Sequence, residues 1–109
     1  MGLIIDQSMQ QLYQEIGGVV IGRSYWFNSQ ASWPFGGIEI YYDKIVLRML
    51  WFRTEIKSYD IISIEKYGRF KNGLRIIHKN ASISPYITYS SFHQKRLVQK
   101  LIEAGYKIK

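Results

Sequence analysis

The first periodic signal in the chain is a spacing of four, three and four residues between apolar side chains. Four residues occupy these steps: Ile5, Met9, Leu12 and Ile16. This spacing lines one face of an α-helix, so we predict an amphipathic helix over residues 3–16 that stops at Gly17 and forms an N-terminal segment of residues 1–17. Its apolar face would pack either on its own domain or on a second subunit. The segment 3–16 has no Lys or Arg, which argues against a helix lying on lipid.

From Val19 onward, short runs of β-branched and aromatic residues alternate with turn-forming residues. This pattern is typical of an antiparallel sheet, and in residues 52–57 apolar and polar positions alternate cleanly. We predict seven strands, within 19–28 and at 37–42, 45–50, 52–57, 61–67, 74–79 and 86–89. Residues 28–33, followed by Pro34, are predicted to form a polar break between the first two strands.

The end of the chain predicts a helix over about residues 92–104. Ser91 and Gln94 have the spacing of a capping box, and Gly105 stands where a C-terminal cap belongs. An apolar stripe runs between them: Phe92, Leu97, Val98, Leu101 and Ile102. We therefore expect this helix to cover the open end of the sheet, with Leu97 and Leu101 deeply buried.

The 109 residues and 12.9 kDa fit one domain, which we place at residues 18–109. A total of 15 Lys and Arg against 8 Asp and Glu gives a net charge of +7, which favours attraction to anionic lipid or nucleic acid. The absence of Cys excludes disulfides and thiolate chemistry and favours a reducing compartment, so we expect a cytoplasmic protein. The longest apolar stretch, residues 45–52, is too short to span a bilayer, although peripheral contact with a membrane fits the charge.

Three segments taken in order resemble the pleckstrin-homology (PH) superfold, in its bacterial and GRAM-like branch. Residues 32–35, Ser-Trp-Pro-Phe, lead into residues 37–40 and look like the opening strand of such domains, and residues 59–65 resemble their recurrent aromatic-Asp-Ile-x-x-Ile element. The predicted last helix resembles their closing helix, so that the likeness covers about residues 32–106. It implies a mainly β (α+β) fold: a seven-stranded antiparallel barrel or sandwich capped by a C-terminal α-helix, here with a short N-terminal helix added.

The same resemblance implies a binding module that performs no turnover, because members of the superfold commonly hold phosphoinositides, peptides or partner proteins. Phosphoinositide-binding members typically carry a basic pattern around the loop between their first two strands. Residues 28–36 contain no Lys or Arg, and Asp43 accompanies Lys44 in the next turn. Recognition of a specific lipid headgroup is therefore not carried over to this chain.

Residues suited to catalysis are few in this sequence. His78 and His93 are the side chains that could act as bases near neutral pH, and neither has the spacing of a metal ligand or of a catalytic pair. Ser91 beside His93 already has the predicted capping role, and no acid is placed to orient the imidazole. We therefore expect no catalytic residue, no metal, no cofactor and no small-molecule substrate.

The strongest candidate site is a basic hairpin. Its residues are Lys66, Arg69, Phe70, Lys71, Arg75 and Lys79. Phe70 at the tip would enter an anionic membrane surface while the cations contact headgroups. The same residues suit single-stranded nucleic acid, with Phe70 or Tyr67 stacking on a base. A third interpretation is a solvated hairpin whose charges protect a sheet edge.

Aromatic residues between positions 25 and 35 form a second candidate. We assign Phe27 and Phe35 to the core and leave Trp26 and Trp33 open between core and a peptide groove. An interface would then combine Trp26 and Trp33 with the apolar face of the predicted N-terminal helix. The leading hypothesis is a module that binds a partner protein or a second copy of itself, with weak affinity for anionic membranes. The alternative is a small basic β-barrel that binds single-stranded nucleic acid.

Overall fold

A computed structural model describes residues 10–23, 28–50, 52–68 and 72–109. Its regular elements are β1 (Gln11–Gly22), β2 (Asn28–Tyr41), β3 (Lys44–Met49), β4 (Phe52–Lys57), the short 3₁₀ turn η2 (Ser58–Asp60), β5 (Ile61–Tyr67), β6 (Gly73–His78), β7 (Tyr86–Ser90) and α1 (Gln94–Glu103). The strands form one seven-stranded antiparallel sheet in the order β4-β3-β2-β1-β7-β6-β5. The mainly β fold with a C-terminal helix is thus confirmed.

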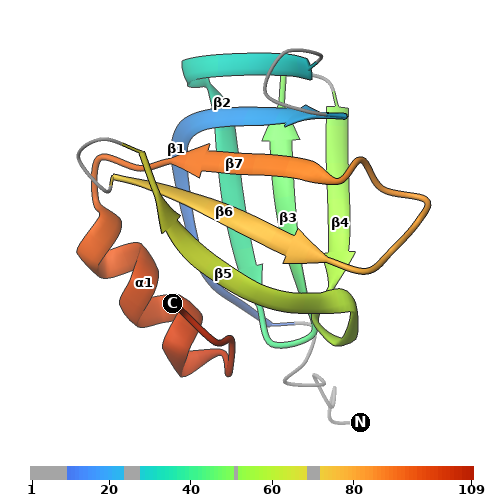
Figure 1. Cartoon of the computed structure of the whole chain (residues 1–109). Helices are drawn as coiled ribbons and strands as arrows, with labels where there is room; N and C mark the ends of the chain where they lie inside the picture. Colours follow the sequence, from blue (N-terminus) through green and yellow to red (C-terminus); the bar gives the residue numbers. More distant parts are fainter. Residues whose placement is uncertain (1–9, 24–27, 51, 69–71) are drawn as a thin grey trace, which may run out of the picture.

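The sheet curls into a half-barrel because its central strand, β1, bends. The first part of β1 pairs with the second half of β2, while residues 18–22 pair with β7 on the other side. The ladder to β2 changes register between Gly17 and Val19, where Gly17 lies opposite Gly36. A side chain on Gly17 would collide with the Tyr89 ring, so the close approach at the bend requires glycine. As a result β5, β6 and β7 lie across β2, β3 and β4, and α1 runs along the open side (Figure 1).

The core lies between the two halves of the curled sheet. Fully buried side chains from both halves and from α1 meet there, among them Ile38, Ile40, Ile45, Leu47, Ile56, Ile64, Leu74, Ile76, Ile87, Tyr89, Leu97 and Leu101. Leu97 and Leu101 are 0% exposed, which confirms that α1 closes the core. Val98 also packs against the core, whereas the predicted stripe positions Phe92 and Ile102 do not, since Phe92 lies before the helix and Ile102 is exposed.

The capping prediction is confirmed at the C-terminal end of α1 and wrong at its N-terminal end. Gly105 has a φ of +95°, its N–H bonds to the Ile102 carbonyl at 2.9 Å, and the Tyr106 N–H bonds to the Leu101 carbonyl at 3.0 Å. These are the two bonds of a Schellman motif, so the C-terminal cap is confirmed. The predicted capping box is wrong, because His93 is the N-cap residue and Gln94 Nε2 instead donates to the Gly73 carbonyl.

The predicted N-terminal helix is wrong for residues 11–16, which lie in β1; residues 1–9 fall outside the described part of the chain. In β1, alternate residues from Tyr13 to Ile21 turn toward the core, and Ile16, on the opposite face, is 51% exposed. Glu15 and Gly17 occupy two of the inward positions, so the alternation carries no continuous apolar signal. The three-and-four spacing was therefore more visible in the sequence than the true period of two.

The predicted polar break is also wrong, because residues 28–34 belong to β2. Asn28 to Ala31 pair with residues 19–22 of β1, beyond the bend. Polar residues are tolerated in this part of β2 because Ser29, Gln30 and Ser32 are exposed to solvent. The predicted bounds of the fourth and fifth strands coincide with β4 and β5.

Candidate functional site

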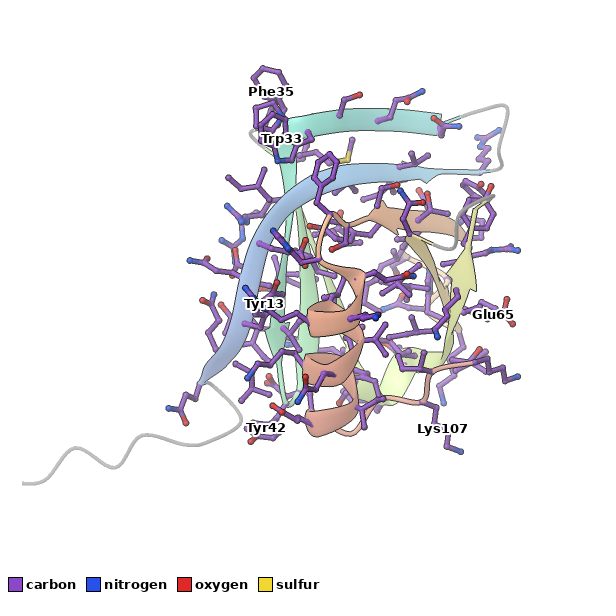
Figure 2. The ribbon with its side chains drawn as sticks, turned by 90° about the vertical axis from the view of Figure 1, so that its left-hand side faces the viewer. Tyr13, Trp33, Phe35, Tyr42, Glu65 and Lys107 are labelled. Carbon is purple, nitrogen blue, oxygen red and sulfur yellow. The ribbon has the colours of Figure 1, made fainter. Side chains whose placement is uncertain are left out.

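A group of large apolar side chains remains exposed at one end of the half-barrel. We call it the apolar patch, and it consists of Trp33 (57% exposed), Phe35 (59%), Leu50 (57%), Phe52 (67%) and Phe92 (73%). Figure 2 shows Trp33 and Phe35 projecting together from this end of the molecule. Scattered exposed apolar residues are ordinary on protein surfaces, whereas a contiguous group marks a site of interaction.

The strand register brings the patch together from β2 and the β3–β4 hairpin. Phe35 lies opposite the hairpin tip, since the Leu50 N–H bonds to the Phe35 carbonyl at 3.0 Å. Leu50 has a φ of +50° in the tight turn between the paired residues Met49 and Phe52. This turn holds the Leu50 side chain at the rim, where the core cannot cover it.

Phe92 joins the patch from the segment that precedes α1. Its ring meets the Trp33 ring edge to face, with centroids 5.9 Å apart and an interplanar angle of 88°. This geometry favours the contact through the quadrupoles of the two rings. The segment is held by Ser91, whose Oγ accepts a hydrogen bond from the His93 N–H at 2.9 Å and donates to Glu15. Trp33 and Phe92 are therefore positioned before any partner arrives.

Trp33 lines two hollows of the surface. The smaller one, of about 240 Å³, is also lined by Ala31, Ser91 and Phe92. The larger one, of about 520 Å³, carries charged side chains, with Arg48, Arg96, His93 and Glu15 on its walls. A Trp ring that lines two hollows, close to two guanidinium groups, can hold an apolar segment that also bears carboxylates.

Glu15, on the wall of the larger hollow, has its carboxylate oxygens occupied by neighbouring hydroxyls. Its carboxylate accepts hydrogen bonds from Tyr13 OH at 3.0 Å, Tyr89 OH at 3.2 Å and Ser91 Oγ at 2.7 Å. Burial raises the pKa of the Tyr89 phenol far above its ordinary value, and the Glu15 charge raises it further. The pKa of Tyr13 is raised by the same two causes in the same order. These groups thus form a structural network rather than an acid–base pair near neutral pH.

Arg48 is held at the larger hollow by a buried carboxylate. Its Nε lies 3.0 Å from Glu39 Oε2, and Arg53 Nη2 lies 3.7 Å from Glu39 Oε1. Glu39 is 6% exposed and also accepts a hydrogen bond from Tyr41 OH at 2.7 Å. Because the guanidinium is already anchored, the Arg48 side chain would lose little conformational entropy when it binds a ligand.

The residues of the predicted basic hairpin are placed as follows. Arg69, Phe70 and Lys71 lie outside the described residues. Lys66 is exposed near the end of β5, whereas Lys79 follows the far end of β6. The described part of the hairpin therefore does not bring these two cations together.

Arg75, in the middle of β6, is half-buried, and its guanidinium lies 5.5 Å from the centre of the Tyr86 ring. Arg75 lies opposite Glu65 in the β5–β6 ladder. The predicted hairpin began at Lys66, so this acid, one residue before it, was not counted against the basic charges.

The predicted interface residues are also partly placed. Ile5, Met9 and Trp26 lie outside the described residues, and Leu12 is half-buried in β1. Ile16 and Trp33 line the same larger hollow, so these two do come together. The assignment of Phe35 to the core is wrong, because the buried stretch of β2 covers residues 36–40 and Phe35 lies just outside it, exposed at the rim.

Sequence reasoning missed Leu50, Phe52 and Phe92 as site residues. Phe52 and Phe92 were each placed inside a predicted element, where an apolar residue is normally expected to be buried. A signal for Leu50 and Phe52 was present in the very short connection between the predicted strands 45–50 and 52–57, which places the residues on both sides of it at the end of the sheet.

The histidines have structural surroundings. His78 Nδ1 accepts a hydrogen bond from the Asn80 N–H at 3.1 Å, so the proton lies on Nε2, which donates to the Ser84 carbonyl at 2.9 Å. His93 is exposed at the start of α1. Within the described ranges, no group of three or more His, Asp or Glu is arranged to hold a metal ion.

No helix in the described part of the chain is long and apolar enough to cross a membrane. Comparisons with protein-family models, with curated proteins and with solved structures found no match for this chain.

Proposed function

We propose that this chain is a non-enzymatic binding module of PH-like architecture whose apolar patch holds a partner protein. The observation that carries the proposal is the patch itself, five large apolar side chains that are each more than half exposed. The Trp33–Phe92 ring contact, the Leu50–Phe35 hydrogen bond and the β3–β4 turn place them at one end of the fold. Apolar patches of this kind mark interaction sites in proteins whose cores are otherwise complete. A pre-positioned Trp that lines two hollows is a typical anchor point of an interface.

The charges around the patch define the chemistry of the partner. Arg48 and Arg96 line the larger hollow, and Glu15 beside them is saturated by hydroxyl donors. Three guanidinium groups, Arg48, Arg53 and Arg96, lie here against two carboxylates, Glu15 and Glu39, so the charge beside the patch is positive, in agreement with the charge of +7 on the whole chain. The partner segment is accordingly one that carries apolar anchors together with Asp or Glu.

The strand order supports the PH-like part of the proposal. The two sheet halves, β1 to β4 and β5 to β7, are each connected in sequence, and they meet where β7 pairs with β1. A C-terminal helix packs its buried leucines into the open side. Seven antiparallel strands with a closing helix are what the PH resemblance implies, except that residues 37–40, likened to the opening strand, lie in β2 and that β1 precedes residues 32–106. PH-like domains commonly act by binding.

The experiment selects peptides from a random library on the immobilised chain and measures their Kd by fluorescence anisotropy. Selected peptides are expected to combine aromatic or aliphatic residues with Asp or Glu. Trp33→Ala and Phe92→Ala should each weaken binding by about tenfold or more, as truncation of an anchor residue does. Arg96→Glu should weaken it further for the acidic peptides.

Tyr59→Ala is the matched control, because Tyr59 is 72% exposed in η2, which contributes no residue to the patch. Its Kd should equal that of the parent. The proposal fails if no peptide is selected above background, or if Trp33→Ala and Tyr59→Ala have equal effects. Vesicles containing phosphatidylserine and a short single-stranded oligonucleotide, titrated in parallel, test the lipid and nucleic-acid alternatives. Saturation of either at physiological salt with no loss in Trp33→Ala would favour that alternative.

A further inference from the structure

The two ends of the sheet differ in how their edges are covered. At the β5 end, the last residues of the chain add hydrogen bonds: Ile64 N–H to the Lys107 carbonyl at 3.0 Å, and Lys109 N–H to the Ile64 carbonyl at 2.8 Å. At the other end, β4 has β3 as its hydrogen-bonded neighbour, and no described residue pairs with its outer side. β4 therefore exposes a strand edge, the outermost of the green strands in Figure 1.

The backbone groups on that edge belong to alternate residues of β4. The Ser58 N–H, directly after β4, bonds to the Asp43 carbonyl at 2.8 Å, which shows that even-numbered residues face β3. The Leu50 N–H bonds to Phe35 in β2, so the odd-numbered residues of β3 are those that face β4, in agreement with the register. The N–H and C=O groups of Arg53, Glu55 and Lys57 consequently point away from the sheet.

We propose that β4 pairs antiparallel with β4 of a second copy of this chain, in a register centred on Thr54. In this register Arg53 of each copy lies opposite Glu55 of the other, and their outward backbone groups bond to each other. The arrangement obeys a two-fold axis, so the charge pair forms twice. The pairing is a β-strand addition in which the added strand is identical to the edge that receives it.

Alternative registers are less favourable for electrostatic or geometric reasons. A register centred on Arg53 or on Glu55 places two like charges directly opposite each other, which destabilises antiparallel pairs. A register centred on Ile56 pairs Glu55 with Lys57 but overlaps the strand only over residues 55–57, since η2 begins at Ser58. The Thr54 register overlaps residues 52–56. Within the described residues, positions 29–31 of β2 also have a strand neighbour on one side, but they carry no charged side chain that could define a register.

Both charged side chains remain available for such a pair. The side chains of Arg53 and Glu55 are 55% and 41% exposed, and their partners within the chain, Glu39 and Lys44, lie toward the interior of the sheet at 3.7 Å and 3.3 Å. The register also sets the exposed Phe52 opposite Ile56 of the second copy. Phe52 is the one residue of the apolar patch that belongs to β4, and Trp33 and Phe92 lie outside this strand, so this inference can be tested separately from the proposed function.

The test measures the dimerisation Kd by sedimentation velocity up to about 500 µM, because a single added strand makes a small and hence weak interface. Arg53→Glu places Glu opposite Glu, and Glu55→Arg places Arg opposite Arg. Each variant alone should raise the Kd by at least about tenfold, because two attractive pairs become two repulsive ones. An equimolar mixture of the two variants should dimerise again as well as the parent, since each mixed pair then joins Glu with Arg.

Lys57→Glu is the matched control, with the same change of charge on the same edge but no charged residue opposite it in this register. Its Kd should stay within about twofold of the parent. Trp33→Ala should also leave dimerisation unchanged, which separates this surface from the apolar patch. A parent that stays monomeric up to the highest concentration overturns the proposal. So does a Lys57→Glu effect equal to that of Arg53→Glu, or a mixture that does not recover the parent Kd. Thermal melts of each variant show whether it is folded.

Discussion

Ser91 Oγ lies 2.7 Å from Glu15 Oε2 and donates a hydrogen bond to it across 76 residues of sequence. This contact ties the bend of β1 to the segment that carries Phe92 into the apolar patch. Tyr13 and Tyr89 donate to the same carboxylate, so an acid inside the curve of the sheet has its acceptor sites occupied. The network thus connects the closure of the half-barrel with the position of the candidate site.

The first prediction concerns this network. Glu15→Ala should lower the free energy of unfolding by about 1–3 kcal/mol, because the hydroxyls of Tyr89 and Ser91 are buried and lose their acceptor. Glu15→Gln keeps one carbonyl acceptor and should cost less. Urea denaturation of the three proteins gives the comparison. Equal midpoints for all three would show that the network does not stabilise the fold.

A second prediction follows from the buried phenols. Burial raises the pKa of both Tyr89 and Tyr106, with Glu15 and Asp43 respectively as the second cause. Above about pH 10 the unfolded chain loses these phenol protons while the folded chain keeps them, so the free energy of unfolding falls as pH rises. Each tyrosine contributes a slope of up to about 1.4 kcal/mol per pH unit, and the stabilisation is fully present below pH 10.

The measurement is urea unfolding from pH 8 to pH 11 on the parent and on Tyr89→Phe/Tyr106→Phe. The double variant should show a shallower decline above pH 10, since two of the groups that release protons only on unfolding are gone. Identical slopes in the two proteins would contradict the assignment of raised pKa values to these phenols.

The third prediction tests the helix that closes the core. Leu101→Ala should cost about 2–5 kcal/mol, because Leu101 is completely buried and its removal leaves a cavity. Ile102→Ala provides the control on the same helix, since Ile102 is 58% exposed, and it should change stability by about 0.5 kcal/mol or less. Chemical denaturation compares the two; similar losses would mean that α1 does not pack as described.

The last prediction concerns the end of α1. Gly105 has a φ of +95°, and nothing lies within 4 Å of the position that a Cβ would occupy. Gly105→Ala should therefore destabilise by about 1 kcal/mol through backbone conformation alone, without a steric clash. Gly105→Asn should cost less, because Asn tolerates positive φ better. Thermal melts rank the three proteins, and an Ala variant as stable as the parent would exclude a conformational role for Gly105.

Much of the fold could be predicted because several elements show their burial in their own sequence. In residues 52–57 and 61–67 local alternation and turn residues define strands whose bounds coincide with β4 and β5. In α1 the four-residue step from Leu97 to Leu101 marks the buried face, and Gly105 marks the end. These signals are local, since one side of each element faces the core over its whole length.

Other features depended on which distant residues came to lie beside each other. Glu15 can face inward because Ser91 and Tyr89, from the far end of the chain, supply donors, so the strand period of β1 was hidden from a local reading. The first half of β2 is a strand because β1 bends and offers it an edge. The sequence by itself determined the strand-rich domain and its closing helix. The tertiary structure decided that Trp33 and Phe92 stay exposed together and that no described strand covers the outer edge of β4, because exposure depends on where neighbouring elements end and not on the residues' own hydrophobicity.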